Sequence, residues 1–238
     1  LRLIELWYFT QVGPLDPRAK KLPLPDDLEG ELLQYVIGHE VGHALGLRHN
    51  FRAHSAYSVK QLRSREFTEK FGPSPSIMDY SRFNYVAQPG DNAFLLPIIG
   101  VYDYFAIDWG YRVIPGAKTC ADQHAELDRM AARQLDDPAL RFGGENDPAD
   151  VDPTVNTQVL GSDPIESTDM GLRNIDRVVP MMIPATSELG RPYYQLNEVY
   201  QTLLVKRQKE LLSVAKIVGG VEETRYHAGR GTVPFKPV

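Results

Sequence analysis

Cysteine, long hydrophobic segments and an excess of basic residues are all missing from this sequence. One cysteine among 238 residues excludes an intramolecular disulfide, so cysteine content does not indicate a cellular compartment. No apolar run reaches the roughly 20 residues that a membrane-spanning helix requires, and we expect no transmembrane segment. A net charge of −5 argues against nucleic acid or an anionic membrane as partner. The remaining composition is that of an ordinary globular protein.

Histidine is also scarce, but three of the six histidines fall within one short segment. His39 and His43 are four residues apart, so a helix places them on the same face with Glu40 beside them. Gly46 can end that helix in the left-handed conformation and let the chain bring His49 back toward the other two. Three histidine nitrogens with a fourth position open are typical of one catalytic Zn²⁺ ion.

Weaker interpretations exist for each part of this segment. A single histidine is more often a surface or core residue than a ligand, and pairs at a four-residue spacing occur on many helices. The complete string fixes five positions at once, which favours the zinc site. The histidine face of the helix must then border a cleft, and we expect Val41, Ala44 and Leu45 to help fill the core.

The string resembles the long zinc signature of the metzincin metallopeptidases. Metzincins also have a methionine-containing turn beneath the metal, and residues 76–80, Ser-Ile-Met-Asp-Tyr, are similar to the version found in astacins and serralysins. The resemblance implies that Met78 forms the hydrophobic floor of the site. It also implies that Tyr80 is an extra ligand or a donor to the oxyanion. The alternatives are core filling for Met78 and a buried aromatic for Tyr80.

Taken together, the pattern is similar to large bacterial metzincin-like zinc metalloproteases that carry a helical C-terminal region. This resemblance implies a secreted hydrolase, located outside the cell, in the periplasm or in the cell envelope. It would be an endopeptidase acting on a peptide or protein substrate, with Glu40 as the general base for a zinc-activated water. Two alternatives stay open: a non-catalytic zinc-binding module, and a zinc hydrolase of a non-peptide amide.

The expected fold is α+β and metzincin-like, but mainly α in this chain. We expect a partial catalytic domain at residues 1–112, with the zinc helix at about 26–46, and a helical C-terminal region at 113–238. Metzincins place a twisted sheet before the zinc helix, whereas only 38 residues precede His39 here. We therefore expect an upstream part of the same polypeptide to supply the sheet, and apolar residues of the zinc helix to face water without it.

Two later helices are predicted from apolar spacing. The first spans about residues 99–111 and is ended by Gly110; its Asp103 either supports the site as an acceptor or is an exposed carboxylate. The second spans about residues 192–217, with an inward stripe formed by Leu196, Val199, Tyr200, Leu203, Leu204, Leu211 and Val214.

Residues 136–164 are rich in aspartate, proline and glycine and are predicted to form an irregular connection. Their acidic residues suggest a calcium site, but the spacing is not that of an EF-hand. A solvated acidic loop is the preferred interpretation for Glu145, Asp147, Asp150 and Asp152.

Overall fold

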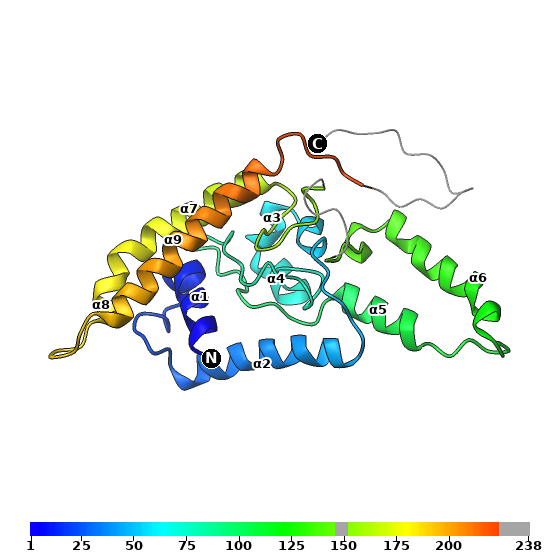
Figure 1. Ribbon diagram of the computed structural model, residues 1–238, viewed down its shortest axis with the longest axis horizontal. Helices are drawn as coiled ribbons and strands as arrows, with labels where there is room; N and C mark the ends of the chain where they lie inside the picture. Colours follow the sequence, from blue (N-terminus) through cyan, green and yellow to red (C-terminus); the bar gives the residue numbers. More distant parts are fainter. Residues whose placement is uncertain (146–151, 224–238) are drawn as a thin grey trace.

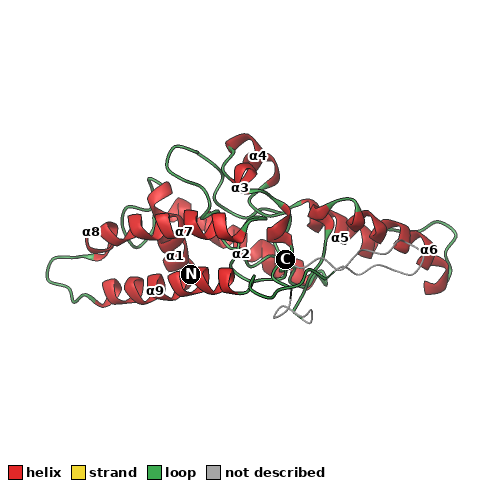
Figure 2. Cartoon of the chain, turned by 90° about the horizontal axis from the view of Figure 1, so that it is seen from above, coloured by secondary structure: helices red, strands yellow, loops and turns green. Residues whose placement is uncertain are grey.

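The structure, a computed structural model, describes residues 1–145 and 152–223 (Figure 1). This described part is helical and contains no β-strand, as Figure 2 shows. The mainly α prediction is thus confirmed, whereas the metzincin-like fold and its upstream sheet stay predictions. The α-helices are α1 (Arg2–Val12), α2 (Asp26–Ala44), α3 (Val59–Leu62), α4 (Arg65–Phe71), α5 (Val101–Tyr111), α6 (Cys120–Ala131), α7 (Pro164–Val178), α8 (Met182–Thr186) and α9 (Tyr194–Ala215). Short 3₁₀ helices occur at Gly13–Leu15, Ala53–Ala56, Ala132–Leu135, Pro138–Leu140 and Val179–Met181.

The molecule is elongated, with helical layers at its two ends and an irregular centre (Figure 1). At one end α7 and α9 run antiparallel to each other, and α1 packs against both. At the other end α5 packs against α6. The long helix α2 extends along one side from the α1 end toward α5, so it carries its C-terminal residues to the middle of the molecule.

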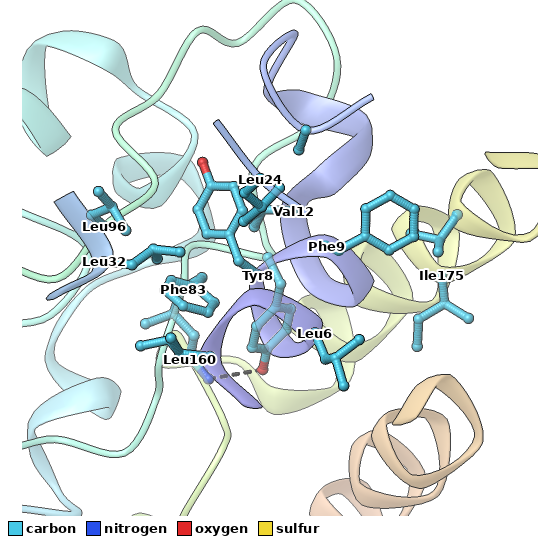
Figure 3. Close-up of a cluster of buried hydrophobic side chains, with 14 of the residues drawn as sticks. Leu6, Tyr8, Phe9, Val12, Leu24, Leu32, Phe83, Leu96, Leu160 and Ile175 are labelled. Carbon is cyan, nitrogen blue, oxygen red and sulfur yellow. Dashed lines mark hydrogen bonds between the residues drawn. The ribbon is translucent and has the colours of Figure 1, made fainter. Parts of the chain in front are cut away.

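Helix α1 lies at the centre of the main hydrophobic core. Tyr8, Phe9 and Val12 are almost completely buried. Figure 3 shows Phe9 directed at Ile175 of α7, while Phe83 lies on the other side of α1 near Leu32 of α2. One hydrophobic cluster therefore joins segments from both sides of residue 112. The boundary at that residue stays a prediction.

Helix α2 begins and ends for reasons that are visible in the sequence. Its first turn carries Asp26, Asp27 and Glu29, where acidic side chains favour the positive end of the helix. Its last helical residue is Ala44, two residues earlier than predicted, and Gly46 has a φ of +86°. This confirms the predicted left-handed glycine.

The outer face of α2 differs from the prediction. Val41, Ala44 and Leu45 are exposed, so their assignment to the core is wrong. An apolar stripe at four-residue spacing runs along this outer face and consists of Leu33, Ile37, Val41 and Leu45. Its members are 42–59% exposed. The core contacts the opposite face of α2. Side chains on the outer face point away from that core, so they stay exposed. The expectation that apolar residues of the zinc helix face water agrees with this stripe.

Two other predictions about helices are also corrected. Gly110 does not end its helix, because α5 continues through Tyr111. On α9, Val199 and Leu203 are buried as predicted, but Tyr200, Leu204 and Leu211 are exposed. The buried face of α9 continues instead through the polar residues Lys206, Glu210 and Ser213. Lys206 and Glu210 pair at 2.5 Å, and this mutual neutralisation permits their burial.

Candidate metal centre

The three predicted histidines converge at the end of α2. His39 and His43 lie on the helix, and His49 follows after the chain has turned back. One ligand nitrogen from each ring lies within 4.8 Å of the others, and the Nε2 atoms of His43 and His49 are 3.0 Å apart. This is the one group of three or more potential metal-binding side chains found in the described residues.

Each imidazole uses Nδ1 for a hydrogen bond and leaves Nε2 for the centre. The Nδ1 of His39 donates to the carbonyl of Ile77 at 2.8 Å, and that of His43 donates to the carbonyl of Leu47 at 2.9 Å. A carbonyl can only accept, so both Nδ1 atoms carry the proton and both Nε2 lone pairs are free. Burial also lowers the pKa of His39, which favours the neutral form that binds metal.

The turn that returns His49 is built around Gly46. The amide of Leu47 donates to the carbonyl of Gly42, and the amide of Gly46 donates to the carbonyl of His43. These two bonds form a Schellman motif with a left-handed glycine. A β-carbon at Gly46 would meet nothing within 4 Å, so its backbone conformation, rather than lack of space, requires glycine here.

The methionine turn lies directly beneath α2. Met78 is fully buried, and a β-carbon placed on Gly42 would lie 2.4 Å from its sulfur. One helical turn earlier, a β-carbon on Gly38 would lie 2.9 Å from Cδ1 of Ile77. Two glycines on one face of α2 therefore let the turn approach the helix closely. The sequence analysis assigned no role to either, although their four-residue spacing was a usable signal.

Asp103 holds the methionine turn in place from α5. Its carboxylate accepts hydrogen bonds from the Ser76 hydroxyl, the Ile77 amide and the Gly100 amide at 2.6–2.8 Å. Asp103 is buried, and burial raises its pKa even though the three donors favour the charged form. The Ile77 carbonyl in turn accepts from His39, so Asp103 acts on the first histidine through one peptide unit. Of the two interpretations of Asp103, the supporting acceptor is confirmed.

The two predicted catalytic residues are Tyr80 and Glu40. The ring centroid of Tyr80 is 4.3 Å from that of His49 and 5.7 Å from that of His39. Glu40 is exposed and adjacent to His39, and its charge only partly opposes the lowering of the His39 pKa by burial. Asp79, between Met78 and Tyr80, is buried; burial raises its pKa to about 7, although Ser74 donates to it.

Glu145 contacts His49, which the sequence analysis did not anticipate. The Nδ1 of His49 donates to the Glu145 carboxylate, and Arg48 lies 4.0 Å from the same side chain. A carboxylate behind a metal-binding histidine fixes its tautomer and orientation. Because 96 positions separate the two residues, no local spacing pattern could have revealed the contact.

The segment that carries Glu145 is fastened by Asn50. Asn50 is fully buried; its amide group donates to the Arg141 carbonyl, and its side-chain oxygen accepts from the Gly143 amide. The backbone amide of Asn50 donates to the Met78 carbonyl. One residue, through its side chain and its backbone amide, thus ties together the chain after His49, the methionine turn and the segment with Glu145.

The solvated acidic loop is wrong for Asp152, whereas Glu145 is exposed, as that interpretation predicts. Glu145 contacts His49, and Asp152 is buried 3.6 Å from Arg52 with Thr154 donating to it. Asp147 and Asp150 lie outside the described residues. A solvated loop therefore does not account for the burial of Asp152.

The donor set fits zinc. Three neutral imidazoles with fixed tautomers, and no thiolate, form the ligand set of a mononuclear zinc site with an open position. A sequence search against known families matches residues 21–238 to a family described as Met-zincin, and the chain belongs to this family. Searches of curated proteins and of solved structures find no match. Among the described residues, no helix is both long and apolar enough to cross a membrane.

Proposed function

We propose that the protein is a zinc-dependent endopeptidase. The main support is the convergence of His39, His43 and His49, each with its second ring nitrogen held by a hydrogen bond. Because the rings are already held in place, they do not have to rearrange before an ion binds. Membership of the Met-zincin family agrees with a zinc peptidase at the family level.

The chain's own residues supply the proton transfers. A zinc ion held by His39, His43 and His49 would lower the pKa of a bound water to roughly 7 and would polarise a carbonyl oxygen. Glu40, adjacent to His39 and exposed, takes the proton of the attacking water and delivers it to the departing amine. The Tyr80 hydroxyl donates to the developing oxyanion. No serine or cysteine nucleophile is required.

The first alternative, a non-catalytic zinc-binding module, would not require Glu40 to be exposed beside the histidines. The second alternative, hydrolysis of a non-peptide amide, uses the same residues and differs only in substrate. We also keep the predicted location outside the cytoplasm and the domain boundary at residue 112 as proposals.

The deciding experiment compares wild type with Glu40→Gln. Zinc content, measured by elemental analysis, should be one ion per chain in both proteins. Cleavage of a peptide library by Glu40→Gln should be slower by about 10²–10⁴-fold, as is typical for loss of a general acid–base group. Glu188→Gln, which changes an exposed carboxylate of the α8–α9 connection, is the control and should cleave like wild type. Equal rates for wild type and Glu40→Gln would contradict the mechanism.

A further inference from the structure

A cavity of about 270 Å³ lies between α1 and α9, away from the three histidines. Its walls combine apolar side chains with amides, hydroxyls and two lysines, and none of its lining residues carries a carboxylate. The residues that matter for its chemistry are Trp7, Gln11, Gln158, Lys206 and Lys209.

The two lysines differ in their partners. Lys206 is buried and pairs with Glu210 at 2.5 Å, so its charge is compensated. Lys209 is exposed at the cavity and forms no ion pair within the described residues. Partial burial, followed by the charges of Arg82 and Lys206, lowers the pKa of Lys209. Both lysines line the same cavity as Trp7, the ring on which Arg82 stacks.

Arg82 is the second uncompensated cation. Its guanidinium carbon lies 3.4 Å from the ring centroid of Trp7, which lines the cavity. Arg82 is partly buried, and burial lowers its pKa, but it forms no ion pair within the described residues. A stacked ring attracts a cation but does not neutralise it. Three cations and the single carboxylate of Glu210 leave two positive charges, although the whole chain has a net charge of −5.

The cavity is linked to the metal centre through Tyr80. The Arg82 guanidinium lies 5.5 Å from the Tyr80 ring, which itself contacts His49. The backbone amide of Gln158, another lining residue, also donates to the Tyr80 carbonyl at 3.0 Å. A peptide held at the histidines could therefore reach the cavity within a few residues, because an extended chain spans about 3.3–3.6 Å per residue.

We propose that this cavity is a substrate subsite that binds a carboxylate of the peptide, an inference that rests on the proposed endopeptidase function. The carboxylate is held by Lys209, with Arg82 contributing the surrounding positive potential. The buried side-chain oxygen of Gln11, another lining residue, has no hydrogen-bond partner within the described residues. Trp7 supplies an apolar wall for the aliphatic part of the acidic side chain.

The first test measures kcat/KM on peptide pairs that differ only by Glu against Gln at one position, scanned along both sides of the cleaved bond. Wild type should prefer Glu by about tenfold at one position. Lys209→Glu should remove or reverse this preference. Lys60→Glu, an exposed lysine of α3 with the same change in net charge, should retain it. Equal rates on every pair, or an unaltered preference in Lys209→Glu, would overturn the subsite.

The second test does not depend on cleavage. In a Trp109→Phe background, Trp7 is the one remaining tryptophan and reports on the cavity directly. The glutamate peptide should change its fluorescence at a concentration about tenfold lower than the glutamine peptide, and Lys209→Glu should abolish the difference. If the glutamate peptide binds more tightly than the glutamine peptide but is never cleaved, the proposed endopeptidase function fails and the anion-binding site stands. Cleavage without any difference in binding overturns the site alone.

Discussion

The two faces of α2 differ in what covers them. The inner face carries His39 and the glycines at 38 and 42, and it lies against the methionine turn at distances that exclude even a methyl group. The outer face carries an aliphatic stripe, from Leu33 to Leu45, that is roughly half exposed. Small residues thus occupy the part of the inner face that meets the methionine turn, whereas large apolar ones occupy the open face. Whether a residue of α2 is buried therefore depends more on which segment packs against its face than on the hydrophobicity of its side chain.

The largest expected effect concerns the metal on the inner face. His43→Ala removes one of three ligands, and we expect zinc to fall from one ion per chain to nearly none, with activity lost. Elemental analysis after dialysis measures this. His124→Ala, which changes an exposed histidine of α6, should keep its zinc. One zinc ion per chain in His43→Ala would contradict the assignment of the three histidines as the zinc ligands.

Two adjacent leucines compare the faces directly. Leu32 is completely buried and Leu33 is 42% exposed. Leu32→Ala should lower the free energy of unfolding by about 2–5 kcal/mol, because it leaves a cavity. Leu33→Ala should lower it by less than about 1 kcal/mol. Urea denaturation of both variants measures the difference. Equal losses would show that the outer face is covered in solution.

Glu145 tests whether the inner face depends on a distant segment. Glu145→Ala should weaken zinc binding by about 10–100-fold, because His49 loses the acceptor that orients it. Glu145→Gln keeps an acceptor oxygen and should lose less. Competition with a chromogenic chelator gives both affinities. Glu69→Ala, at an exposed acid of α4, should bind zinc like wild type, and the same result for Glu145→Ala would exclude a positioning role.

The smallest expected effects come from two glycines of the same helix. Gly42→Ala places a methyl group against the Met78 sulfur and should destabilise the fold by about 1–3 kcal/mol. Gly30→Ala meets nothing within 4 Å and should stabilise it by roughly 0.5–1 kcal/mol, because alanine loses less entropy in a helix. Thermal unfolding of the two variants should therefore shift in opposite directions. A shift in the same direction would mean that Met78 moves aside.

Local features of the sequence were enough to predict much of the centre. The spacing of His39 and His43 follows from helical geometry, and Gly46 follows from the backbone that a return of His49 requires. These interactions span ten residues or fewer, so the chain specifies them without reference to distant partners. The start of α2 is equally local, because its acidic residues act within the first turn.

Two features required the tertiary structure. Glu145 orients His49 across 96 positions, and the α9 face turns a Lys206–Glu210 pair inward while Leu204 and Leu211 stay exposed. Periodicity shows that a helix has an apolar side, but the side that is buried depends on which elements pack against it. Hydrophobicity and spacing determined the helices and the histidine site, whereas the packing of α1, α7 and α9 and the return of the Glu145 segment decided which polar groups became buried.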